Sequence, residues 1–132
     1  MRFMLMMHAP RGSGDWDATG WSPEDIRAHM DFMHALNRDL AGNGELVSGE
    51  GLAPPGQARL VRAGQNGGPP ITDGPFPEAK EFLAGFWIVD VDTPERAHEI
   101  AAKISAAPGP AGKTLFIPVE VRQVMSAPLP EE

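Results

Sequence analysis

Cysteine is absent from the 132-residue sequence, and this absence excludes several kinds of site. The chain has no disulfide framework, no thiol nucleophile and no cysteine-rich zinc site, so a metal would need histidine, aspartate and glutamate ligands. His8 and His98 show no metal-ligating spacing with another ligand. The sequence also lacks a nucleophile elbow, a P-loop and a dinucleotide fingerprint. We therefore expect neither a bound metal nor a cofactor.

Long apolar runs and an excess of positive charge are also missing. The apolar stretches are far too short to cross a bilayer, and the N-terminus leads into a strand-like segment rather than an export signal. The 18 acidic and 11 basic residues give a net charge of −7, and the basic residues are scattered. Nucleic acid binding loses its electrostatic driving force on such a surface. We expect a cytoplasmic protein with no membrane or nucleic-acid partner.

What is present is ordinary for a folded domain. The sequence is 42% hydrophobic and 22% charged, which is typical of a globular protein and excludes disorder of the whole chain. Its length suits one core. We expect a single domain over residues 1–125 and a loose C-terminal tail over residues 126–132.

The order of predicted elements is β-α-β-β-α-β with one inserted hairpin. Ser22 followed by Pro23 and two acids predicts a helix start, and Gly42 and Gly44 predict its end. The apolar stripe of this helix is Ile26, Met30, Met33, Leu36 and Leu40. Thr93 is the predicted cap of a second helix. The predicted strands occupy residues 2–8, part of 44–55, 82–92 and 114–125, and the hairpin occupies 58–74.

This order predicts an α+β, ferredoxin-like fold with a hairpin insertion between its second and third strands. In that fold both helices cover one face of an antiparallel sheet. Residues 82–91 are apolar at both odd and even positions, so both faces of the sheet are apolar. Because an uncovered apolar face marks an interface, we expect a homodimer that associates through the sheet.

One segment carries a family resemblance. The stretch DGPFPEAKEFLAGFWIVDV, together with GEGLAPP before it and VEVRQVM near the end, resembles the DGPF-motif branch of the YCII-related family. The resemblance implies a dimeric α/β-barrel of the ferredoxin-like type, with small-molecule pockets between sheet and helices. Most members have no assigned activity, although one relative dehydrochlorinates a chlorinated hydroxyquinol. A His-Asp pair is a proposed active site in another branch, and the family's helix histidine falls nearest Phe32, between His29 and His34.

Asp73 to Phe76 are open to two interpretations. In the structural one, Asp73 accepts hydrogen bonds from its own turn and Phe76 packs against a dimer partner. In the functional one, Asp73 is a general base or orienting carboxylate at a pocket rim, and Lys80 is its electrostatic partner or binds an anion.

Two histidines and one further carboxylate are the remaining candidates. His29 shares the apolar stripe of the first helix with Asn37, so it is either a hydrogen-bonded core residue or a pocket base. His34 lies at the edge of the stripe, where it is either solvated or a binding residue. Glu50 lies between two glycines at a strand end, as a surface residue or a pocket acid.

Two functional hypotheses follow. The first is a small cofactor-independent enzyme that transfers a proton on an aromatic or lactone-like substrate, as an isomerase or lyase. The second is a non-catalytic dimeric module that binds a ligand or regulates a partner. The two are separated by whether His29, Asp73 and Glu50 meet at one cavity, because the fold alone does not choose between them.

Overall fold

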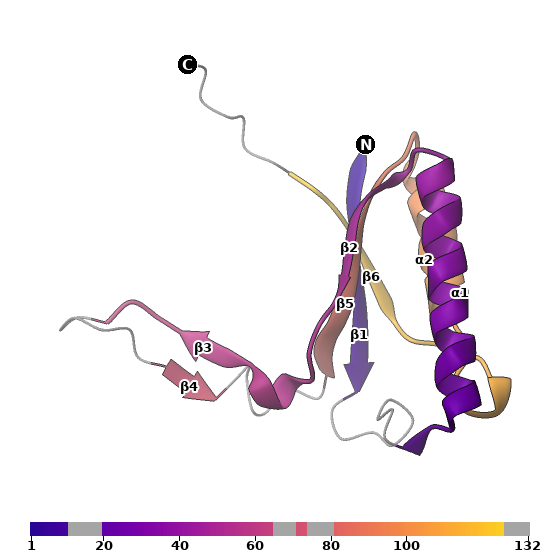
Figure 1. Ribbon diagram of the computed structural model, residues 1–132. Helices are drawn as coiled ribbons and strands as arrows, with labels where there is room; N and C mark the ends of the chain where they lie inside the picture. The colour runs from indigo at the N-terminus through magenta and orange to yellow at the C-terminus, as the bar shows by residue number, and fades with distance from the viewer. Residues whose placement is uncertain (11–19, 65–70, 74–80, 126–132) are drawn as a thin grey trace.

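The body of the protein is a four-stranded antiparallel sheet with two helices on one side (Figure 1). The computed structural model describes residues 1–10, 20–64, 71–73 and 81–125. The strands are β1 Arg2–Pro10, β2 Leu46–Gly51, β3 Arg59–Val61, β4 Ile71–Asp73, β5 Glu81–Asp90 and β6 Val119–Gln123. The helices are α1 Pro23–Gly42 and α2 Pro94–Ser105, with single turns η2 Pro55–Gln57 and η3 Pro110–Gly112.

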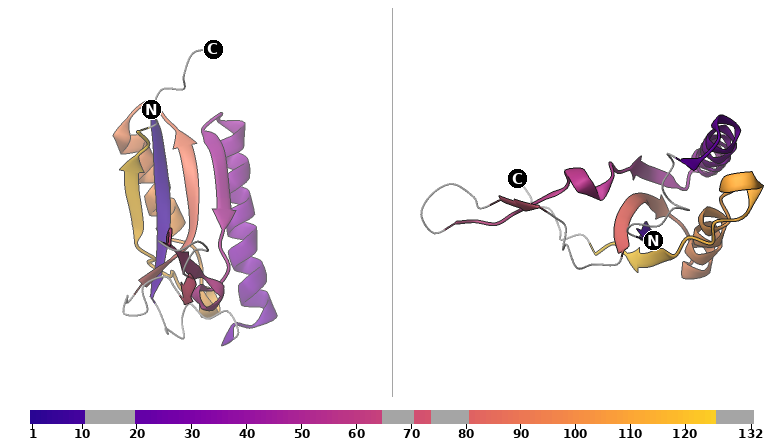
Figure 2. Two further views of the ribbon diagram at one scale, coloured as in Figure 1. Left: turned by 90° about the vertical axis from the view of Figure 1, so that its left-hand side faces the viewer. Right: turned by 90° about the horizontal axis from the view of Figure 1, so that it is seen from below.

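The strand order in the main sheet is β2-β5-β1-β6, and β3 and β4 form a separate two-stranded hairpin. Both helices lie on the same side of the sheet, whereas the hairpin extends away from it (Figures 1 and 2). This arrangement confirms the predicted ferredoxin-like α+β fold. No helix in the described part of the chain has both the length and the apolar content needed to span a membrane.

Helix α1 begins as the sequence predicts. Ser22 caps it, since its hydroxyl accepts a hydrogen bond from the backbone N–H of Asp25 and the Asp25 carboxylate accepts one from Ser22 N–H. Gly44 lies just beyond the end of the helix and has a φ of 74°. Glycine adopts this left-handed conformation without steric strain because it has no Cβ.

The apolar stripe of α1 is buried only along its C-terminal half. Met33, Leu36 and Leu40 are buried, but Ile26 is 41% and Met30 45% exposed, contrary to the expectation of one continuous stripe. The reason is the position of the helix. It lies over the edge strand β2, where the sheet carries glycines and offers no side chains to cover Met30.

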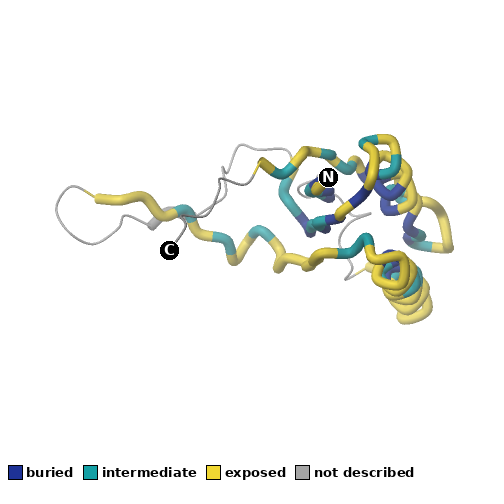
Figure 3. The backbone as a smooth tube through the Cα atoms, turned by 90° about the horizontal axis from the view of Figure 1, so that it is seen from above, coloured by how far each residue is buried: buried dark blue, intermediate teal, exposed yellow. Residues whose placement is uncertain are grey.

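Helix α2 supplies most of the remaining core. Thr93 caps it by accepting a hydrogen bond from the backbone N–H of Arg96. Its buried residues are Ala97, Ile100, Ala101 and Ile104, of which all but Ala101 are completely buried. They face β1 and β6, and Figure 3 shows the buried residues gathered there while α1 is mostly exposed. The core is therefore asymmetric, dense under α2 and thin under α1.

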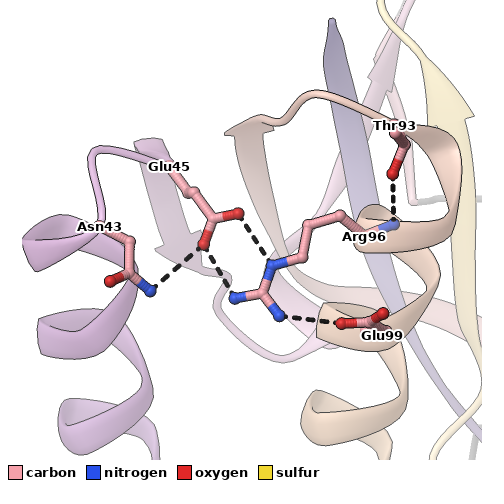
Figure 4. A network of polar contacts seen from close by, with 5 residues as sticks. All are labelled: Asn43, Glu45, Thr93, Arg96 and Glu99. Atoms are coloured by element: carbon pink, nitrogen blue, oxygen red, sulfur yellow. Dashed lines mark hydrogen bonds and ion pairs between the residues drawn. The ribbon is translucent and has the colours of Figure 1, made fainter.

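An ion pair joins the start of β2 to α2 (Figure 4). Arg96 donates from Nε and Nη2 to the two carboxylate oxygens of Glu45, at 2.8 and 2.9 Å, and from Nη1 to Glu99 at 3.1 Å. Hydrogen bonding to Arg96 lowers the pKa of Glu45 below its ordinary value of 4.5, and the same bonds raise the pKa of Arg96. This bidentate pair fixes α2 against the edge of the sheet.

The face of the sheet opposite the helices carries a half-buried apolar patch. Strand alternation directs Phe3, Leu5 and Met7 toward the helices and Met4 and Met6 away from them. Register brings Met4 beside Ile88 and Met6 beside Phe86, so these four side chains form what we call the open-face patch. The helices do not cover it.

Two strand predictions need correction. The last strand covers only Val119–Gln123 instead of residues 114–125, because Phe116 has a φ of 53° and Pro118 has no N–H to donate. The first strand continues two residues past His8, to Pro10. The inserted hairpin is confirmed between β2 and β5, with Arg59 opposite Asp73.

Candidate functional site

An open cavity of about 260 Å³ lies between α1 and the β2–β5 edge of the sheet. Helix α1 contributes His29, Met30, Met33, His34 and Asn37, and the sheet contributes Trp87 and three glycines. The walls are thus mostly thioether and aromatic groups, with a few polar atoms among them. Such a composition suits a small apolar ligand that is oriented by a few hydrogen bonds.

Glycines form the floor of this cavity. A Cβ on Gly49 would lie 3.2 Å from the Trp87 ring, which places this position on the helix side of the sheet, and alternation places Gly51 on the same side. A Cβ on Gly85 would lie 3.0 Å from the Glu50 carbonyl oxygen and 3.8 Å from the Met7 side chain. The cavity exists because three helix-facing positions, Gly49 and Gly51 on β2 and Gly85 on β5, have no side chain.

His29 is held from two directions. Its Nδ1 lies 3.0 Å from the carbonyl oxygen of Pro108, and its ring meets Trp21 edge-on, with centroids 5.5 Å apart. Because a carbonyl oxygen only accepts hydrogen bonds, Nδ1 carries the proton in the neutral ring and Nε2 carries the lone pair. The structure therefore gives His29 a defined tautomer whose basic atom is Nε2.

The loop that carries Pro108 is fixed against the first turn of α1. Leu115 N–H donates to the Ala107 carbonyl at 3.0 Å, which closes the loop on itself. Ala111, in a left-handed conformation with a φ of 58°, donates its N–H to the carboxylate of Asp25 at 3.1 Å. Asp25 thus serves both the helix cap and the loop, and so sets the distance between His29 and the Pro108 carbonyl.

Asn37 lies eight residues beyond His29 and has a defined orientation. The indole N–H of Trp87 donates to Asn37 Oδ1 at 2.9 Å. Since an indole nitrogen only donates, the amide atom facing it must be the oxygen, and the Nδ2 group is turned elsewhere. The Trp87 indole N–H thus fixes which way the Asn37 amide is turned.

The structure brings together three of the predicted site residues. His29, His34 and Glu50 all border this cavity, with His29 half-buried and the other two exposed. Glu50 alternates with Gly49 and Gly51 and pairs in register with Phe86, so its side chain lies on the open face and its backbone borders the cavity. Whether Glu50 acts as a pocket acid stays a prediction.

Asp73, the first residue of the DGPF stretch, lies in another part of the fold. Asp73 ends β4 in the separate hairpin sheet, which extends away from the helices (Figure 1). Phe76 and Lys80 lie outside the described residues. The roles assigned to these three residues stay predictions.

Other functional features had weaker sequence signals. Glycines inside a strand indicate close approach of a ligand or another backbone, so GEG at 49–51 was an available signal for the floor. The contact between His29 and Pro108 joins residues 79 positions apart and has no local signature. Trp21 likewise precedes the helix cap without any recognisable motif.

Two further cavities are less suited to chemistry. One, of about 350 Å³, is apolar and lies at the base of the hairpin between residues 52–58 and the start of β5. The other, of about 540 Å³, surrounds the Glu45–Arg96 ion pair, whose groups already satisfy each other. In the part of the chain that the structure describes, no three potential ligands cluster as a metal site would require. Among these three cavities of the described residues, only the one under α1 combines apolar walls with a histidine of defined tautomer.

Comparison with known proteins gives the family. The family model described as the YCII-related domain matches residues 1–115, from β1 to the loop before β6. An uncharacterised protein of Rhizobium meliloti (strain 1021) is 32% identical over 91 residues, which cover 67% of this chain and 71% of the relative. This match covers most of both proteins. The chain belongs to the YCII-related family.

Proposed function

We propose that the cavity between α1 and the sheet binds a small molecule, and that His29 takes a proton from it without a cofactor. The observation that carries this proposal is the hydrogen bond of 3.0 Å from His29 Nδ1 to the Pro108 carbonyl, at the wall of an apolar cavity. It leaves the basic nitrogen of a neutral imidazole on the other edge of the ring.

The surroundings favour proton transfer over other chemistry. Imidazole is the commonest general base in enzymes because its ordinary pKa lies near neutral pH. The thioethers of Met30 and Met33 give the cavity adaptable apolar walls, in which a flat or weakly polar molecule can pack. The proposed substrate is aromatic or lactone-like, and the proposed reaction is an isomerisation or elimination that begins with removal of a proton.

The test is exchange of a carbon-bound proton with solvent. A panel of enolisable lactones and aryl-substituted 2-oxo acids is incubated with the protein in D2O, and deuterium incorporation is followed by NMR. The account predicts that the wild-type protein accelerates exchange for part of the panel and that His29→Asn abolishes the acceleration. Asparagine retains a donor for the Pro108 carbonyl, so the variant removes the base while keeping the contact.

His34→Asn is the matched control, because the same substitution then falls on the same helix at an exposed position bordering the same cavity. If His34→Asn abolished exchange and His29→Asn did not, His34 would be the base instead of His29. Saturable binding of the panel without any exchange would favour a ligand-binding module instead.

We further propose that the protein is a homodimer that associates through the open-face patch. The support is the apolar character of Met4, Met6, Phe86 and Ile88 on a face that neither α1 nor α2 covers. Light scattering should give a dimer for the wild-type protein and a monomer for Ile88→Lys. A wild-type monomer at micromolar concentration would contradict the proposal.

The DGPF stretch enters the proposal in a secondary role. We propose that the chain belongs to the DGPF branch, that Asp73 and Lys80 act at a pocket rim, and that Phe76 contacts the dimer partner. A cytoplasmic location is part of the same proposal. Asp73→Asn should then lower the exchange rate or the affinity for the panel, and unchanged values for both would remove Asp73 from the site.

A further inference from the structure

We infer that the β3–β4 hairpin is a dimerisation arm, which packs against the body of a second copy of this chain. The inference deepens the proposed function, since it rests on the proposed homodimer and adds a second contact surface to the open-face patch. It does not involve the cavity under α1.

The arm projects from the side of the sheet that the helices leave uncovered. Figures 1 and 2 show α1 and α2 on one side of the main sheet and the hairpin on the other, and the view in Figure 3 agrees. Beyond their contact with each other, β3 and β4 make at most marginal contact with the other elements that the structure describes. A molecule that covers the open-face patch would therefore meet the arm as well.

The arm is too short to be stable by itself. Each of its strands has three residues, and an isolated two-stranded hairpin is marginally stable at best in water. Val61, which pairs in register with Ile71, is 57% exposed, so the arm presents an apolar side chain to solvent. A protein surface that buries this side chain would supply the packing that the hairpin needs.

The base of the arm holds it in this direction. Pro54 and Pro55 fix two successive φ angles, and in the η2 turn that follows the Ala58 N–H donates to the Pro55 carbonyl at 3.0 Å. Arg59 Nη1 donates to the carbonyl oxygens of Gly56 and Ala58, at 3.2 and 2.8 Å, and so ties β3 to the turn. An arm that is already ordered loses little conformational entropy on binding, which favours association.

An apolar surface connects the open-face patch to the base of the arm. His8 lies on the same face as Met6, because its Nε2 is 2.9 Å from the carboxylate of Glu120, which pairs in register with Met6. Leu83 pairs with His8 and also lines the apolar cavity of about 350 Å³ at the base of the arm. The patch, Leu83 and the arm are therefore parts of one surface.

Charge favours a second copy of this chain as the occupant of that surface. The chain has a net charge of −7 and its open face carries the exposed Glu50, whereas Arg62, which follows β3, is exposed on the arm. Two acidic bodies repel each other, and a basic arm laid on the opposite body reduces this repulsion. In a two-fold dimer each copy gives one arm and receives one, so every contact forms twice.

The substitution Val61→Glu tests the arm through the dimer dissociation constant. Analytical ultracentrifugation should give a constant at least tenfold higher than that of the wild-type protein, because each dimer buries two arms. Val61→Thr, which keeps strand propensity, should weaken the dimer in the same direction but less. Ile26→Glu is the matched control, since it places the same charge at an exposed apolar residue of α1, on the far side of the sheet, and should change the constant less than twofold.

A spin label reports directly whether the arm reaches the second copy. The chain has no cysteine, so a nitroxide on Ala63→Cys, at an exposed position of the arm, is the single label in the molecule. The labelled chain is mixed with wild-type chain that carries nitrogen-15, so only contacts between copies broaden the observed amide signals. The label on the arm should broaden amides of the main sheet, whereas the same label on Ile26→Cys should leave them sharp.

An unchanged dissociation constant in Val61→Glu, equal effects of Val61→Glu and Ile26→Glu, or no broadening between copies would overturn the inference. These outcomes differ from failure of the proposed dimer. A dimer that Ile88→Lys dissociates and Val61→Glu does not would retain the open-face patch and remove the arm. A wild-type monomer at micromolar concentration would remove both, and the exchange test of His29 is independent of either.

Discussion

The glycine floor gives a prediction that compares one substitution at two positions. Gly51 and Gly85 both border the cavity, on adjacent strands. A Cβ on Gly51 would have no atom within 4 Å, and the backbone there has no positive φ. A Cβ on Gly85 would lie 3.0 Å from the Glu50 carbonyl oxygen and 3.5 Å from the Gly51 Cα, both of which are backbone atoms of the paired strand.

The two alanine variants should therefore change stability in opposite directions. Gly51→Ala should stabilise the protein by about 0.4–1 kcal/mol, because alanine lowers the conformational entropy of the unfolded chain at a position that it can adopt without strain. Gly85→Ala should destabilise it by about 1–3 kcal/mol, because backbone at 3.0 Å cannot rotate away and β2 must shift from β5.

Urea unfolding followed by tryptophan fluorescence measures both changes. A difference between the variants of about 1.4–4 kcal/mol is expected from these two ranges. Equal effects of the two substitutions, or a neutral Gly85→Ala, would show that the strands do not approach each other as closely as described. The assignment of Gly85 to the cavity floor would then be wrong.

Three further predictions concern the ion pair, the histidine and the cavity volume. Because Arg96 lowers the pKa of Glu45, the stabilisation from this pair is present above pH 4.5 and is lost as the pH falls through the folded-state pKa. In Arg96→Met the free energy of unfolding, measured as a function of pH, should therefore fall less steeply over this acidic range. His29→Asn should change the free energy of unfolding by less than about 1 kcal/mol, whereas His29→Phe, which removes the donor to the Pro108 carbonyl, should cost about 0.5–1.5 kcal/mol. Gly51→Leu should leave the fold intact by circular dichroism and abolish binding of the panel of lactones and 2-oxo acids, because its side chain enters open space at the cavity floor.

The sequence contained most of the fold. The Ser22 and Thr93 caps, the alternation in β1 and the apolar run of β5 are local signals, and each predicted element that depends on them is present. The wrong predictions concern residues whose conformation or burial depends on tertiary contacts. Phe116 has strand propensity, but its positive φ ends the extended segment, and Met30 has the right helical period but nothing to pack against.

The candidate site was only partly accessible from the sequence. His29 was selected because a polar residue in an apolar stripe needs a partner, and the structure supplies one in the Pro108 carbonyl. That partner lies in another loop, so no local pattern identifies it. The direction in which Asn37 presents its amide depends in the same way on Trp87, which is fifty positions away.

The tautomer of His29 gives the most direct test of the proposed base, since the basic atom is Nε2 only if the proton lies on Nδ1. Nitrogen-15 NMR of the imidazole above its titration range distinguishes a protonated Nδ1 from a protonated Nε2, and His29→Asn identifies the resonance. We expect the proton to lie on Nδ1 in the neutral ring, where it is donated to the Pro108 carbonyl. A proton on Nε2 in the neutral ring would contradict this assignment and the role of His29 as the base.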